Sequence, residues 1–400
     1  MKRILCALLS VLLIFCLAAE GETMKDLEPL HELTDARGFK LGAPISFYQM
    51  NDLAYLTMVA RHFNSVTPTN ELKAYSLLDQ WNSRRSEDGM PRMNFTQADR
   101  MVNWAQMNGV GVRGHVLVWD AYMTEWFFHE DYDVSKPFAS PEVMRERTRS
   151  YIEQVITHFE EKFPGVIYCW DVVNEAVGDS IADYDPSDAR HIRTTRGGTP
   201  NLFYRYLGKD YVEFAFLCAR DTVDRLGADI TLVYNDYNTF YAEKRMAISA
   251  LLESINTYAQ NEDGSYRRLV DAVGMQGYIG GYGQQAGCMN DNDIEYIRAS
   301  IRAYADLGYE VHVTEMAVRN YDIKQAALHV DFYGRLFEMF VSMNEDTVRL
   351  TGVSIWGLCD NPYMPTTDYS YKQNSPYCGL IDNKYLPKPE TYAVIEALKK

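Results

Sequence analysis

Short apolar runs alternate with longer stretches of helical periodicity along this 400-residue chain. Eight of the runs have the length and residue content of buried strands; they span 38–46, 63–68, 110–119, 166–175, 229–236, 272–279, 310–317 and 353–358. Helical periodicity is clearest over 144–163, 203–227 and 293–308, and Gly227 and Gly308 are placed to end the last two of these helices. Eight strand–helix units in series predict an α/β fold, a parallel (β/α)8 barrel.

Two of the predicted strands carry a glutamate at or near their ends. Glu175 follows Asn174 in IYCWDVVNEA, and Glu315 lies in EVHVTEMA. The C-terminal ends of barrel strands face the active site. Two glutamates in such places therefore indicate an acid/base and a nucleophile that act on one glycosidic bond. A single strand-end glutamate is as often part of a structural ion pair, but the joint placement on the fourth and seventh strands favours catalysis.

The first 19 residues have the pattern of a secretory signal peptide. Two basic residues precede an apolar run over 4–17, and Ala18-Ala19 supplies small residues for cleavage. The alternative is a membrane anchor, but the run is shorter than the ~20 residues that span a bilayer. We therefore expect a secreted protein in which residues 20–400 form a single catalytic barrel domain.

Charge and composition limit the possible partners. The formal net charge of −16 argues against nucleic acid, because phosphate contacts need clustered Lys and Arg. Beyond the N-terminal run, no segment is apolar enough to predict stable membrane insertion. Aromatic residues make up 13% of the chain, and part of that content is expected in a groove where flat rings stack on sugars.

Five cysteines remain once the predicted signal is removed: Cys169, Cys218, Cys288, Cys359 and Cys378. Their spacing matches no CxxC metal motif. Cys169 lies in a predicted apolar strand, where it is most simply a small buried hydrophobic residue. Cys359 and Cys378 flank one predicted loop and either remain thiols or pair in an oxidising compartment.

Seven short motifs occur in the order and strand placement of a known family: FNSVTPTNELK, RGHVLVWD, WDVVNEA, NDYN, GMQ, TEM and SIWG. From about Asp35 to its end, the chain resembles glycoside hydrolase family 10, the retaining endo-β-1,4-xylanases. The resemblance implies a (β/α)8 barrel that hydrolyses xylan and xylo-oligosaccharides by double displacement. It implies neither a cofactor nor a metal, and we expect a monomer.

The resemblance also implies a role for each matched residue. Glu175 is the general acid/base and Glu315 the nucleophile. Around the sugar whose bond is cut, the implied contacts are Asn174, His115 and Gln276, with Trp119 and Trp356 as walls. The next sugar on the non-reducing side is met by Asn70 and Lys73, and the leaving-group side by Asn235 and Tyr237. Three simpler interpretations stay open: His115 as a core residue, Trp119 and Trp356 as core residues, and Lys73 as a solvated charge at a helix start.

Four positions depart from the family pattern. Thr69 stands where the family has a Glu that contacts the second sugar, and Asp120 replaces the second His of the HTLVWH motif. Tyr278 replaces the His after GMQ, and Ala317 replaces an Asp that usually joins this His in one network with the nucleophile. Because both catalytic glutamates remain, we infer a coordinated change. The Tyr278 hydroxyl is expected to donate a hydrogen bond to Glu315, with Ala317 leaving room for the ring.

Two other functions remain open at this point. A related retaining β-glycosidase with a preference for β-1,4-glucan or short aryl glycosides would share the same site residues. A non-catalytic sugar-binding barrel would be expected to lack at least one of the two glutamates, and both are present.

Overall fold

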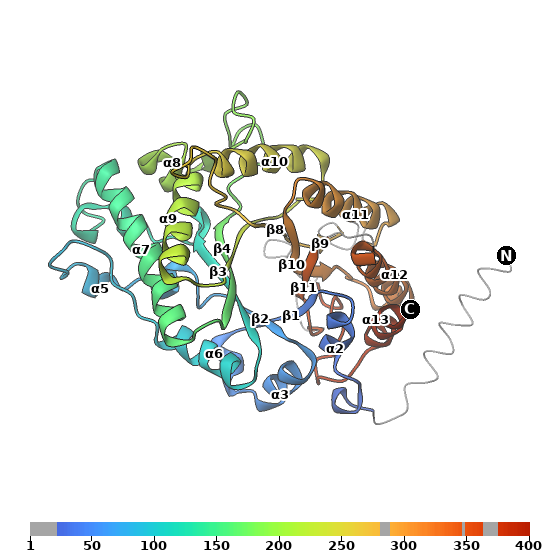
Figure 1. Cartoon of the computed structure of the whole chain (residues 1–400). Helices are drawn as coiled ribbons and strands as arrows, with labels where there is room; N and C mark the ends of the chain where they lie inside the picture. The colour runs from blue at the N-terminus through green and yellow to red at the C-terminus, as the bar shows by residue number, and fades with distance from the viewer. Residues whose placement is uncertain (1–21, 281–288, 346–348, 363–374) are drawn as a thin grey trace. The chain divides into compact units, whose positions relative to one another are not determined.

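The computed structural model describes residues 22–280, 289–345, 349–362 and 375–400 (Figure 1). The predicted signal peptide, Cys288 and most of the loop between Cys359 and Cys378 lie outside these ranges. The chain divides into two compact units, each of which is described by itself. Unit 1 comprises Met1–Pro44, Asp52–Asn64 and Gln276–Lys400; unit 2 comprises Ile45–Asn51 and Ser65–Met275.

Unit 2 contains five parallel strands that neighbour one another in chain order. They are β2 (Ser65–Pro68), β3 (Gly111–Val118), β4 (Ile167–Asn174), β7 (Thr231–Asp236) and β8 (Ala272–Met275). A short antiparallel hairpin, β5 (Thr195–Arg196) with β6 (Thr199–Pro200), lies in the long segment after β4. The helices of this unit are α4 (Ala74–Leu77), α5 (Gln80–Ser83), α6 (Thr96–Met107), α7 (Pro141–Lys162), α8 (Leu202–Leu207), α9 (Tyr211–Leu226) and α10 (Ala242–Asn256).

Unit 1 contains strands from both ends of the chain. These are β1 (Lys40–Ile45), β9 (Tyr278–Ile279), β10 (Glu310–Val318) and β11 (Leu350–Ile355). Strand β11 pairs in parallel with β1 and β10, and β10 also pairs in parallel with β9. The α-helices are α2 (Leu30–Asp35), α3 (Leu53–His62), α11 (Asp291–Asp306), α12 (Ala326–Glu345) and α13 (Pro389–Lys399), and the 3₁₀ helix η1 covers Met24–Asp26.

Every predicted strand is present, the sixth as the two pieces β8 and β9. Parallel strands that follow chain order and are separated by helices define a (β/α)8 barrel, so the predicted fold class is confirmed. One helix prediction was wrong: the stretch 203–227 forms two helices, α8 and α9. The helix is interrupted at Gly208, whose φ of 102° lies outside the helical region. Gly227, with φ 64°, ends α9 as predicted.

The interior strands pack closely enough to require small residues at specific points. A Cβ atom at Gly114 on β3 would lie 2.4 Å from the Trp170 ring on β4, so only glycine fits there. Cys169 is fully buried against Val233 and Ala272, as predicted for a small hydrophobic residue. Cys359 and Cys378 are both free thiols, so the disulfide that their placement allowed is not formed.

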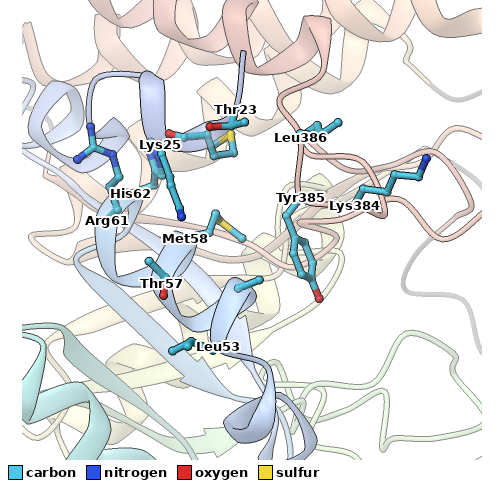
Figure 2. A pocket seen from close by; sticks show the side chains of 12 residues that line it. Thr23, Lys25, Leu53, Thr57, Met58, Arg61, His62, Lys384, Tyr385 and Leu386 are labelled. Carbon is cyan, nitrogen blue, oxygen red and sulfur yellow. Dashed lines mark hydrogen bonds between the residues drawn. The ribbon is translucent and has the colours of Figure 1, made fainter. Parts of the chain in front are cut away.

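A pocket of about 560 Å³ lies in unit 1. It is lined by η1, by α3 and by residues 384–386, with Met58 and Tyr385 among the side chains that line it (Figure 2). None of the residues predicted to act on substrate contributes to this lining. Within the part of the chain that the structure describes, no helix has the length and apolar content needed to cross a membrane.

Candidate active site

In unit 2, Glu175 directly follows β4 in a strained backbone conformation. Its φ is 55°, a left-handed value that is uncommon for a residue with a Cβ. The turn is held by the Glu175 backbone N–H, which donates to the Asn235 carbonyl oxygen at 2.9 Å. Asn174 and Asn235 are partners in the β4–β7 register, and the Asn235 amide donates to Asn174 Oδ1 at 2.9 Å. The structure therefore brings these three predicted residues together.

His115 on β3 is oriented by a buried carboxylate. Its Nδ1 lies 2.8 Å from Asp171 Oδ2, and Arg113 donates to both oxygens of the same carboxylate. Burial alone would raise the pKa of Asp171, but the adjacent Arg113 and His115 hold it below its usual value. A carboxylate on Nδ1 fixes the position of the imidazole. The fully buried His329 has the same kind of contact, with Glu390 on its Nδ1, so the arrangement fits a core histidine as well as a sugar-binding one.

The predicted contacts to the next sugar form a second cluster in unit 2. The Lys73 ammonium donates to Asn70 Oδ1 at 3.1 Å. It also lies 4.3 Å from the Tyr122 ring centroid and 5.1 Å from that of Trp119, within the range of cation–π attraction. Lys73 is only 6% exposed. The interpretation of Lys73 as a solvated helix-start charge is therefore wrong.

Tyr237, predicted on the leaving-group side, belongs to a network of ion pairs. Its hydroxyl donates to Asp179 Oδ2 and accepts from Arg193 Nη2 at 3.1 Å. Lys244 bridges Asp179 and Asp236, at 3.0 and 3.1 Å. Burial raises the pKa of the Tyr237 hydroxyl, so it stays protonated and remains a hydrogen-bond donor.

In unit 1, Glu315 lies on β10 and is almost fully buried. The Tyr278 hydroxyl donates to Glu315 Oε2 at 2.5 Å, so the predicted hydrogen bond is present. Ala317 is the register partner of Tyr278 across the β9–β10 pair, which places its small side chain beside the tyrosine. The Arg319 guanidinium lies 5.4 Å from the Tyr278 ring centroid.

The remaining two predicted residues of unit 1 lie near the same strands. Gln276 is buried and precedes β9 by two residues. Trp356 directly follows β11, and its backbone N–H donates to the carbonyl of Met316, the residue after Glu315, at 2.8 Å. Gln276, Tyr278 and Trp356 thus all lie on or directly beside strands of the sheet that carries Glu315.

Sequence reasoning missed several charged residues of the site. Asp171 lies in β4, four residues before Glu175, and the register irregularity between Asp171 and Val173 interrupts the period of two that would place both residues on one face. Arg193, Arg196 and Asp179 lie in the long segment after β4, where periodicity carries no signal. Arg196 donates from Nη1 to Glu175 Oε2 at 3.0 Å, and its only sequence marker is the following Gly-Gly turn.

Sequence comparison places these features in a family context. The model of glycosyl hydrolase family 10 matches residues 29–397. The chain is 33% identical over 340 residues to a putative endo-1,4-beta-xylanase of Caldicellulosiruptor saccharolyticus, which covers 82% of this chain and 96% of that protein. It is 31% identical to endo-1,4-beta-xylanase A of Thermotoga neapolitana, but spans only 30% of that longer protein.

Solved structures agree with the sequence matches. The endo-1,4-beta-D-xylanase 10B modules of Clostridium thermocellum, solved with xylohexaose, match with a TM-score of 0.77 and 27% identity, covering 92% of this chain and 67% of that one. A xylanase of Paenibacillus barcinonensis, solved with a conduramine derivative, matches with a TM-score of 0.70 and 26% identity, over 92% and 98%. The chain therefore belongs to glycosyl hydrolase family 10.

Proposed function

We propose that this protein is an endo-1,4-β-xylanase that cleaves xylan with retention of anomeric configuration. The observation that carries the proposal is the family match over 29–397, in a chain that keeps a glutamate after β4 and another on β10. The relatives named above are xylanases, and one of them was solved with xylohexaose. A non-catalytic sugar-binding barrel would be expected to lack at least one of these glutamates, and both are present.

The proposed chemistry gives each carboxyl group one part in two steps. In the first, the Glu315 carboxylate forms a bond to the anomeric carbon while the glycosidic C–O bond breaks, and the Glu175 proton passes to the leaving oxygen. In the second, water attacks the same carbon, its proton passes to Glu175, and the bond to Glu315 breaks. The Tyr278 hydroxyl holds one oxygen of the nucleophile, and Asn174 and His115 are placed to bind the sugar.

A product profile on glucuronoarabinoxylan tests this function. Wild type is expected to release short xylo-oligosaccharides, and Glu175→Ala to release almost none. Proton NMR of the first products should show the β-anomer, since retention requires it; an initial α-anomer would exclude the mechanism. Release of reducing ends from soluble cellulose at a rate comparable to that from xylan would instead favour a β-1,4-glucanase.

We further propose that the enzyme is secreted. The support is the sequence pattern of the first 19 residues, two basic residues followed by an apolar run and Ala18-Ala19. Expression of the full chain in a bacterial host, followed by N-terminal sequencing of the exported protein, tests it. A mature N-terminus near residue 20 is expected, and a protein that keeps its first residues and stays with the cells contradicts the proposal.

A further inference from the structure

Arg196 is carried by a hairpin whose geometry is tightly defined. Strands β5 and β6 are joined by Gly197 and Gly198, and both glycines have positive φ, 55° and 85°. Two positive φ values in a two-residue loop are the requirement of a type I′ turn, which glycine meets without strain. The hairpin is anchored to the preceding loop, because the Thr194 and Thr195 backbone N–H groups both donate to the Asp183 carbonyl. The backbone that carries Arg196 is thus fixed.

The Arg196 guanidinium joins two carboxylates. Its Nε and Nη2 donate to the two oxygens of Asp120, at 3.1 and 2.7 Å. Its Nη1 donates to Glu175 Oε2 at 3.0 Å. A two-pronged contact with one carboxylate orients the planar group, and here it aims the remaining nitrogen at the acid/base.

The charges and the burial of these three side chains both stabilise the contact of Arg196 with Asp120 and Glu175. The side chains of Asp120 and Glu175 are 6% and 8% exposed, and that of Arg196 is 28% exposed. Burial would lower the pKa of the Arg196 guanidinium, but Asp120 and Glu175 raise it overall, so the group stays charged. Ion pairs that are shielded from solvent are screened by salt much less than surface pairs.

Asp120 gains an explanation from this contact. It stands at one of the four positions where the chain departs from the family pattern, and the sequence alone offers no reason for an acidic residue there. In the structure, the Asp120 carboxylate accepts hydrogen bonds from two nitrogens of Arg196. Asp120 also offsets the charge of Arg196, so that the cation does not act on Glu175 uncompensated.

We propose that Arg196, oriented by Asp120, is a positioning residue for Glu175 in both steps of the reaction. The inference rests on the proposed roles of Glu175 and Glu315. By holding Oε2, Arg196 leaves proton transfer to the other oxygen of Glu175 and fixes the direction from which the proton moves. A fixed cation also stabilises the carboxylate, which is the form that must accept the proton of water in the second step.

The test compares steady-state kinetics of Arg196→Met with wild type on xylan and on a 2,4-dinitrophenyl xylobioside. The activated leaving group needs little protonation, so its first step should survive while the second slows. We expect kcat on the aryl substrate to fall about tenfold, less than the 10²–10⁴-fold effect of a complete acid/base group. KM should fall with it, because the glycosyl-enzyme accumulates, and added azide should restore much of kcat.

Three further variants make the result specific. Arg196→Lys keeps the positive charge but not the planar guanidinium that contacts Asp120 with two nitrogens. Its kcat should therefore lie between those of Arg196→Met and wild type. Asp120→Asn should give a weaker form of the same kinetic signature. Arg190→Met is the matched control: Arg190 lies in the same segment and pairs with Asp188 and Glu213. Its loss is expected to lower the melting temperature without an azide effect.

Two outcomes overturn the inference, and both are distinct from failure of the proposed function. If Arg196→Met loses activity equally on both substrates, with unchanged KM and no azide effect, Arg196 has only a structural role. If its kinetics equal those of wild type, the contact has no function in the reaction. In either case Glu175→Ala should still show azide rescue; if it does not, the assignment of the acid/base itself is wrong.

Discussion

The two carboxyl groups that we propose to be catalytic have different surroundings. Glu175, in unit 2, touches a charged guanidinium and lies beside further ion pairs formed by Arg193, Asp179 and Lys244. Glu315, in unit 1, accepts a hydrogen bond from the neutral hydroxyl of Tyr278. The proposed mechanism gives a reason for the contrast. The acid/base changes its protonation state in each step, whereas the nucleophile starts as a carboxylate and needs only to be held.

The contrast also shows how the departures from the family pattern are compensated. On the nucleophile side, Tyr278 and Ala317 replace two titratable residues by one neutral donor and one small side chain. On the acid/base side, Asp120 adds a carboxylate where the pattern has an imidazole, and Arg196 pairs with it. The departures near Glu315 and those near Glu175 involve different residues in different units. The two sets can therefore be tested separately.

Removal of the carboxyl groups themselves should have the largest effect. Glu315→Ala is expected to abolish turnover of both xylan and aryl xylobiosides, because no covalent intermediate forms. Glu175→Ala should slow xylan hydrolysis about 10²–10⁴-fold. The first step on activated aryl substrates should persist, and azide should rescue the second; burst kinetics with and without azide measure this. Equal losses on all substrates for Glu175→Ala, without azide rescue, would reverse or remove the assignment.

The hydrogen bond from Tyr278 to Glu315 is tested by Tyr278→Phe. A hydrogen bond to a charged group contributes about 1.5–3 kcal/mol, so its loss predicts a fall in kcat of roughly 10–150-fold. The measurement is kcat on xylan, with thermal melting to confirm folding. A variant with near wild-type kcat would show that the hydroxyl does not tune the nucleophile.

A double-mutant cycle at Tyr278 and Ala317 tests whether the two departures act together. Tyr278→His alone should reduce kcat, because the imidazole lacks a carboxylate partner, and adding Ala317→Asp should recover much of the loss. The expected coupling energy exceeds the ~0.5 kcal/mol scatter of independent sites. The double variant should also gain a pH dependence between about pH 5 and 8 that wild-type tyrosine does not contribute. Purely additive effects would mean that the two positions are independent.

A pair of glycine substitutions should have a smaller effect. A Cβ at Gly274 on β8 would lie 2.3 Å from Asn235 Oδ1 and would push that side chain away from Asn174. Gly274→Ala is expected to destabilise the protein by about 1–3 kcal/mol and to lower kcat several-fold. Gly352→Ala on β11 is the control, since a Cβ there would lie 3.9 Å from His312 Cγ, an ordinary van der Waals distance. Equal effects of the two variants on melting temperature and kcat would mean that the close packing of Gly274 against Asn235 does not position that side chain.

The strands could be predicted because they depend on local patterns, whereas the hydrogen bond between Tyr278 and Glu315 joins residues 37 apart and could be predicted only from the family resemblance. A run of apolar residues that ends in Asn174-Glu175 marks a strand end. Tyr278 stands where the family pattern has a His that forms one network with the nucleophile. The contact between Arg196 and Asp120 could not be predicted, because it joins residues 76 apart in sequence. An arginine in a long loop has many possible partners, and only the folded hairpin selects one. Likewise, helical periodicity continues across Gly208, whose backbone conformation divides α8 from α9.

The smallest expected effect concerns Thr69, which directly precedes Asn70 of the predicted sugar-binding cluster in unit 2. Its backbone N–H donates to the Ile45 carbonyl at 2.8 Å, which fixes the main chain beside Asn70 and Lys73. The short side chain of Thr69 reaches less far than the Glu of the family pattern, so we expect weak binding of the second sugar on the non-reducing side. Thr69→Glu should lower KM on xylo-oligosaccharides by about fivefold, the equivalent of ~1 kcal/mol. A kcat that stays constant would place the gain in substrate binding, and an unchanged or raised KM would mean that other residues already fill this role.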